Sequence, residues 1–178
     1  MSSTPQDTYP KIFPEIPTNA LTELSGHLSS GKNSLIFSKF SHQYSRPLIA
    51  WVESPTISLN PCSLLRFNLN PDRFIFIESP LSNVLWCLRE LTQSELFSHV
   101  VFSGKLSLQL RTQEVELRRL QIAAKTHQTG IVFISDTPTL TANWMFALQA
   151  KIHSYAPLDF TLLRHTQNHQ TDFLAQSS

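Results

Sequence analysis

The chain has 178 residues, 41% of them hydrophobic, and 14 Lys and Arg against 13 Asp and Glu. This length suits one domain with a sizeable core, and the near-zero net charge gives no electrostatic basis for nucleic-acid binding. No stretch approaches the roughly 18 apolar residues of a membrane span, and the first residues lack the pattern of a signal peptide, so we expect a cytoplasmic protein.

The N-terminal segment, residues 1–18, is predicted to be an extended arm because it carries four prolines, Pro5, Pro10, Pro14 and Pro17. A single domain over residues 19–165 follows, and residues 166–178 form a polar C-terminal tail. Cys62 and Cys87 are isolated and lack metal-ligand spacing, so we expect both to pack in a reducing compartment.

A glycine loop joins the first predicted strand, residues 20–25, to a predicted helix over residues 34–44. It reads Gly26-His27-Leu28-Ser29-Ser30-Gly31-Lys32. The pattern G-x-x-x-x-G-K-[ST] binds phosphate through its backbone N–H groups and its Lys, and its Ser or Thr ligates Mg²⁺. Here Asn33 replaces that hydroxyl residue. The predicted phosphate-binding residues, which could hold ATP or another anion, are Gly26, Ser29, Ser30, Gly31, Lys32 and Asn33; the alternative is a simple Gly/Ser turn.

Strands and helices alternate along the rest of the domain. Continuous apolar runs predict buried strands at residues 47–53, 73–78, 99–102 and 131–134. A short helix is predicted over residues 60–67, and a longer one from a Ser82 cap to about residue 97. Another helix is predicted over residues 112–127, where Leu117, Leu120 and Ala124 recur at i, i+3 and i+7 and form one apolar stripe. Residues 144–152 and 160–164 have the alternation of antiparallel edge strands. The pattern predicts an α/β fold with a largely parallel sheet.

Hydrolysis at a phosphate loop needs a strand-end acid for Mg²⁺ and a second acid that positions the attacking water. The strand at residues 99–102 is followed by Ser103, which is not an acid. Glu53 and Glu78 also end strands, and Glu53 could polarise water, although a solvated acid is the plainer interpretation of both. Asp136 is interpreted as a turn residue. No catalytic residue is therefore assigned.

Two other patterns in the sequence are candidate sites. Arg118 and Arg119 form a basic pair on the predicted helix, either as a solvated face or as a partner contact, with Glu114 one turn before Arg118. His165 and His169 have i, i+4 spacing in a polar segment, which is weak support for a metal site. We expect no metal.

The order of these pieces resembles the RecA recombinase core in residues 22–32, 48–53, 69–74 and 99–102. It is more similar still to the degenerate RecA-like family of ImuA and SulA. Residues 117–124, Leu-Arg-Arg-Leu-Gln-Ile-Ala-Ala, resemble the L-R-R-L-Q-x-A-A helix of ImuA proteins, and residues 19–24 resemble their G-A-L-T-E-L entry strand. The similarity covers roughly residues 18–165 and implies a RecA-like P-loop core: a mostly parallel central sheet flanked by helices, with antiparallel C-terminal edge strands.

This resemblance implies a non-catalytic adaptor in SOS-induced, error-prone translesion DNA synthesis. Its expected partners are RecA, an ImuB-like Y-family polymerase homologue and a replicative-type polymerase. A SulA-like division inhibitor that binds FtsZ is the first alternative. A weak P-loop ATPase using Glu53 and Lys32 is the second.

The chain departs from active RecA at Asn33, at Ser103, which replaces the strand-end Asp, and near Thr56, where the family has a water-activating Glu. The segments equivalent to the DNA-binding loops, residues 104–111 and 136–142, contain only Lys105 and Arg111 as cations, so direct DNA binding is not expected. The chain also lacks the long helical N-terminus of typical ImuA proteins. Residues 170–174 loosely resemble a sliding-clamp peptide, for which a disordered polar end is the plainer interpretation.

Overall fold

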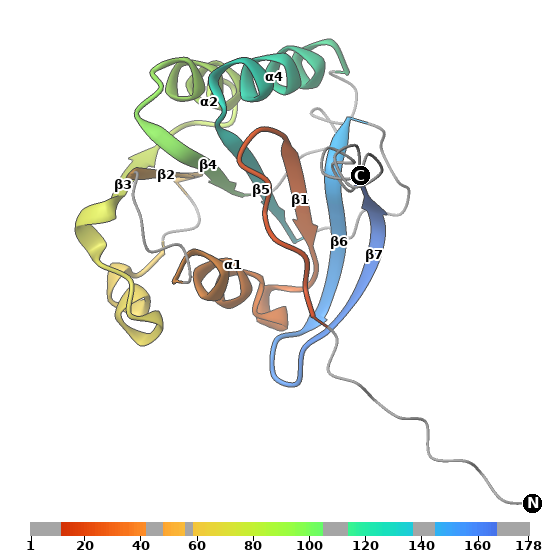
Figure 1. Cartoon of the computed structure of the whole chain (residues 1–178). Coiled ribbons are helices and arrows are strands. Elements are labelled where there is room, and N and C mark those ends of the chain that lie inside the picture. The colour runs from red at the N-terminus through yellow and green to blue at the C-terminus, as the bar shows by residue number, and fades with distance from the viewer. Residues whose placement is uncertain (1–11, 42–47, 56–58, 105–113, 137–144, 167–178) are drawn as a thin grey trace, which may run out of the picture.

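The computed structural model describes residues 12–41, 48–55, 59–104, 114–136 and 145–166. Its centre is a seven-stranded sheet in the order β3-β2-β4-β5-β1-β6-β7 (Figure 1). All neighbouring strands pair in parallel except β6 and β7, which are antiparallel. The strands are β1 Leu21–Ser25, β2 Leu48–Glu53, β3 Phe74–Glu78, β4 Phe97–Ser103, β5 Gly130–Ser135, β6 Phe146–Ser154 and β7 Asp159–His165.

Helices cover both faces of this sheet. Figure 1 shows α1 on one face and α2 and α4 side by side on the other. Their bounds are α1 Lys32–Ser41, α2 Val84–Gln93 and α4 Glu114–His127. The described ranges also contain the short 3₁₀ helices η1 Leu28–Ser30, η2 Pro61–Phe67 and η3 Pro71–Arg73. The prediction of a mixed α/β fold with a mostly parallel sheet and an antiparallel edge is therefore confirmed.

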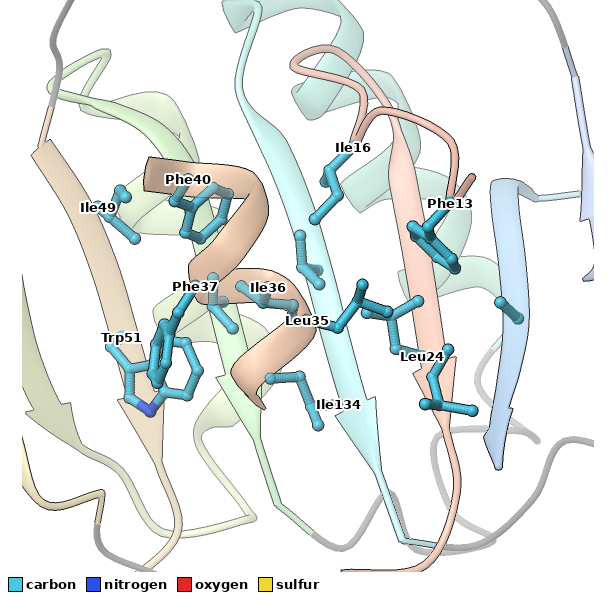
Figure 2. Packing of buried hydrophobic residues seen from close by; sticks show 14 of the residues in the cluster. Phe13, Ile16, Leu24, Leu35, Ile36, Phe37, Phe40, Ile49, Trp51 and Ile134 are labelled. Carbon is cyan, nitrogen blue, oxygen red and sulfur yellow. The ribbon is translucent and has the colours of Figure 1, made fainter. Parts of the chain in front are cut away.

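The core under α1 is rich in aromatic side chains. Figure 2 shows Phe37 and Phe40 of α1 packed toward the sheet, and the rings of Phe37 and Trp51 lie 5.3 Å apart. Phe13 and Ile16, from the end of the predicted N-terminal arm, are also buried here, at 2% and 3% exposure. The described residues before β1, 12–20, form no helix or strand, but they close this side of the core.

The core under α2 and α4 is built from the stripe that the sequence predicted. Leu117, Leu120 and Ala124 of α4 are buried, and they belong to the same cluster as Val84 and Leu88 of α2. These five side chains recur at helical spacing, so one face of each helix packs on the sheet.

Two predicted elements differ from the structure. β3 was expected to be buried on both faces, but among the described strands it pairs only with β2, and Ile75 and Phe76 are 41% and 37% exposed. The predicted Ser82 cap of α2 is wrong, because the N-cap is Asn83, whose side chain makes no capping hydrogen bond. The helix also stops at Gln93, since residues 97–103 are recruited into β4 beside β2 and β5.

The expectation that both cysteines are packing residues is only half right. Cys62 lies on η2 and is exposed, so its prediction is wrong. Cys87 on α2 is partly buried beside the α2–α4 core, and this burial raises the pKa of its thiol.

His99 is a fully buried histidine on β4, with its ring centroid 4.9 Å from that of Phe40. Burial lowers the pKa of its imidazole from 6.5 to about 4, and a hydrogen bond with the backbone of Ile16 partly opposes this shift. Between these two pKa values the unfolded chain binds a proton that the folded protein does not bind. Stability is therefore full above pH 6.5 and falls as the pH decreases toward 4.

We expect His99 to account for about 3 kcal/mol of stability lost across this pH window, since one pKa unit corresponds to about 1.4 kcal/mol. The His99→Leu variant should lose this part of the pH dependence, measured as the free energy of unfolding in urea at several pH values. His27→Leu is the control, because the ring of His27 is exposed in the folded state. Equal pH slopes in wild type and His99→Leu would contradict the assignment.

Candidate functional site

A pocket opens where β1, β4 and β5 end. α1 follows β1 on one face of the sheet, whereas α4 follows β4 on the other face (Figure 1). In α/β sheets such a change of side leaves a crevice at the carboxyl ends of the strands, where ligands commonly bind. The pocket has a volume of about 230 Å³ and is lined by Ser29, Gly31, Lys32, Asn33, Ser34, Ser103, Gly104, Ile134 and Asp136.

The predicted strand, glycine loop and helix are all present. The backbone N–H of Gly26 donates to the carbonyl of Ser135 on β5 (3.2 Å), so the loop starts against the neighbouring strand. η1 follows, and Gly31 then takes a left-handed conformation with φ 79°. α1 begins at Lys32, and its first turn is closed by a hydrogen bond from Leu35 N–H to the Gly31 carbonyl (2.9 Å).

Close packing alone explains both glycines of the loop. A Cβ on Gly26, where φ is 154°, would lie 2.3 Å from the carbonyl oxygen of Ile152 on β6. A Cβ on Gly31 would lie 2.4 Å from the Cβ of Tyr155. Real Cβ atoms do not approach other atoms so closely, so only glycine fits at either position. A bound phosphate is not needed to account for them.

The ammonium group of Lys32 is held entirely by the protein. Its side chain is 4% exposed, and Nζ donates to the carbonyls of Gly26 (2.6 Å) and His27 (3.0 Å) and to Oδ1 of Asp136 (2.9 Å). A lysine ammonium has three N–H donors, and these three acceptors use all of them. The carboxylate of Asp136, 26% exposed, also neutralises the positive charge. The loop therefore presents no uncompensated lysine to an anion.

Asp136 is the residue of the candidate site that sequence reasoning missed, because it was interpreted only as a turn residue. The parallel register pairs Ser25 with Ser135, so the residues that follow, Gly26 and Asp136, leave the sheet side by side. The sequence signal was its position directly after a buried strand. Placing Asp136 beside the glycine loop also requires knowing that β5 pairs with β1.

Glu53 is buried rather than solvated, so the plainer interpretation of this residue is wrong. Its Oε1 accepts hydrogen bonds from Trp51 Nε1 and from the backbone N–H of Leu59, both at 2.7 Å. These contacts hold the carboxylate at the end of β2, and Glu53 is not among the residues that line the pocket. Glu78, by contrast, is exposed at the end of β3, as expected.

The predicted magnesium positions carry neutral side chains. Asn33 and Ser103 both line the pocket, and the single acid among the lining residues is Asp136, which is bonded to Lys32. Within the described ranges no group of three His, Cys, Asp or Glu side chains could hold a metal ion. Thr56, Lys105, Arg111, His169 and residues 170–174 lie outside the described part of the chain.

The other predicted site residues separate into two places. Ser29, Gly31, Lys32 and Asn33 meet at the pocket, while Gly26 and Ser30 are buried and do not line it. Arg118 and Arg119 are exposed on α4, on the opposite face of the sheet from α1 (Figure 1). Arg119 forms an ion pair with Glu116, one turn before it.

The fold and this loop together define a class: a mostly parallel α/β protein whose glycine loop is closed by an internal lysine–aspartate pair. No protein-family model and no curated protein matches the sequence. None of the described helices is long and apolar enough to cross a lipid bilayer.

Proposed function

We propose that the protein is a non-catalytic, RecA-like adaptor in SOS-induced, error-prone translesion DNA synthesis. It acts by binding RecA, an ImuB-like Y-family polymerase homologue and a replicative-type polymerase. The non-catalytic part of the proposal rests on the contacts of Lys32. Its ammonium group donates hydrogen bonds to two loop carbonyls and to Asp136, and the Asp136 carboxylate neutralises its charge.

Phosphoryl transfer depends on positive charge at the phosphates, a magnesium site and a positioned water. The lysine is neutralised, and Asn33 and Ser103 stand where metal-binding side chains would be needed. Glu53, the acid that a weak ATPase would use, is bonded to Trp51 and Leu59. These hydrogen bonds stabilise the fold. We therefore assign no described side chain a role in ATP hydrolysis.

The RecA-like part of the proposal is supported by the arrangement of the sheet. The glycine loop follows a central strand, and β5 lies between that strand and β4, so the loop and Ser103 face one pocket. The helix that resembles ImuA buries Leu117, Leu120 and Ala124, and it exposes Arg118 and Arg119 to solvent, where a partner could contact them.

Capture of purified partners tests the adaptor function. The immobilised full-length protein should retain RecA, the ImuB-like homologue or the replicative-type polymerase in the absence of ATP. Retention of FtsZ alone would replace the proposal with a SulA-like division inhibitor. Retention of none of these proteins would overturn the adaptor function.

Nucleotide assays test the absence of catalysis. We expect no ATP turnover above background with Mg²⁺, because the lysine and both metal positions are unsuited to it. Turnover by wild type that disappears in Lys32→Met, with circular dichroism showing that the variant is folded, would establish the ATPase alternative. The control is His27→Leu, which changes an exposed residue of the same loop that does not line the pocket.

A further inference from the structure

A groove lies between residues of α2 and α4. Both helices cover the face of the sheet opposite α1 (Figure 1). The groove has a volume of about 280 Å³, and it is lined by Arg89, Gln93, Arg119, Ile122, Ala123, Thr126 and His127. The two helices lie side by side here, so the groove is formed by secondary structure rather than by loops.

The lining of the groove contains two arginines and a histidine and no acid. Acidic side chains beside the groove pair with these cations. Glu116 pairs with Arg119 on α4, and Glu90 lies 3.8 Å from Arg89 on α2. Glu95, just after α2, lies 2.8 Å from His127. A basic last turn is expected from the helix dipole and accounts for Lys125 and His127 of α4. It does not account for Arg89 or Arg119, which precede the last turns of their helices.

Large apolar side chains are exposed beside these arginines. Trp86 is 60% exposed and lies one helical turn before Arg89, while Ile122 is 58% exposed and lies in the groove itself. Val115, at 65% exposure, lies one turn before Arg119. Residues three and four apart share a helix face, so each helix presents apolar and cationic side chains together. Gathered exposed apolar side chains commonly mark interaction sites.

We propose that this groove binds an acidic helical segment of a partner protein that carries a large apolar anchor. The proposal rests on the adaptor function, and it specifies the surface and the chemistry of the partner. Carboxylates of the segment would pair with Arg89 and Arg119, whose guanidinium groups suit two-pronged hydrogen bonds, while its apolar side chain would contact Ile122 and Trp86.

A peptide fits this surface better than nucleic acid does. A phosphate backbone is a continuous line of charge, and it would meet Glu90, Glu95 and Glu116 beside the groove. A peptide helix can place its carboxylates over the arginines and its apolar residue over Ile122. Single-stranded DNA is therefore the competing ligand in the test.

The test is fluorescence anisotropy with the full-length protein and a short labelled peptide. The peptide is an alanine-rich helix former that carries one Leu, with one Glu a helical turn before it and one Glu a turn after it. Arg119→Glu and Ile122→Ser should each weaken binding by about tenfold or more. The matched controls are Arg66→Glu and Leu65→Ser, because both side chains are exposed on η2, remote in sequence from either helix of the groove, and they should leave the affinity within about twofold.

Four results would overturn the assignment of this groove: no peptide binding, equal binding of a peptide with Ser in place of Leu, equal effects of the control substitutions, or displacement of the peptide by single-stranded DNA. The partner-capture experiment separates this failure from failure of the adaptor function. If Arg119→Glu and Ile122→Ser still capture every partner that wild type captures, the groove is not the binding surface but the adaptor function stands.

Discussion

Replacing Gly26 with alanine should lower the free energy of unfolding by about 3 kcal/mol or more. The new Cβ would lie 2.3 Å from the carbonyl oxygen of Ile152 and 2.8 Å from Oγ of Ser30, at a φ of 154° that L-residues rarely adopt. Ile152 belongs to β6, which is hydrogen-bonded to β1 and β7, so its backbone cannot move aside without disturbing the sheet. Urea denaturation of both proteins measures the difference.

The control for this substitution is Ser29→Ala, in the same loop. Ser29 is exposed and lines the pocket, so its change should alter stability by less than about 0.5 kcal/mol. A stable Gly26→Ala protein would mean that packing against β6 is not the reason for glycine here. A phosphate-binding role of the loop would then be the better explanation of this residue.

The second large effect is expected at Lys32. Lys32→Met should lower stability by about 2 kcal/mol, because it leaves the carbonyls of Gly26 and His27 and the carboxylate of Asp136 without their shared donor. Asp136→Asn should cost less, about 1 kcal/mol, since this side chain is 26% exposed and an amide oxygen can still accept a hydrogen bond. Denaturation of both single variants and of the double variant measures how strongly the two residues are coupled.

A coupling energy of about 1 kcal/mol would support an internal lysine–aspartate pair, and additive effects within about 0.3 kcal/mol would contradict it. Inorganic phosphate provides a second readout, in isothermal titration. Asp136→Asn should strengthen any phosphate binding by about tenfold, since a neighbouring like charge costs on the order of 1–4 kcal/mol at contact distance. Unchanged phosphate affinity would show that Asp136 does not keep anions from Lys32.

Most of the sheet could be predicted because local patterns report it. Continuous apolar runs correctly placed β2, β4 and β5, and the stripe of Leu117, Leu120 and Ala124 correctly placed the buried face of α4. The same patterns failed for β3, because an apolar run does not reveal whether a strand lies at the centre or at the edge of a sheet. Ile75 and Phe76 are exposed because β3 lies at the edge of the described sheet.

The candidate site was predicted in its position but not in its chemistry. The loop from Gly26 to Lys32, with Asn33 after it, was recognised from a contiguous motif. The buried, hydrogen-bonded state of Glu53 was not predicted, because neither its contact with Trp51, two positions earlier on the same strand, nor its contact with the Leu59 backbone follows from a sequence pattern. The groove between α2 and α4 likewise needed two helices to be placed beside each other, although Arg119 on its own was noticed in the sequence.

The sequence by itself therefore determined the elements, the mostly parallel α/β class and the location of a glycine loop, because these depend on residues close together in the chain. Only the tertiary structure decided what that loop can do. Lys32 meets Asp136, which is 104 positions away, because β5 forms its hydrogen bonds beside β1 and brings its end to the loop. The close contacts of Gly26 with Ile152 and of Gly31 with Tyr155 also depend on the fold. These contacts explain both glycines by packing, without a bound phosphate.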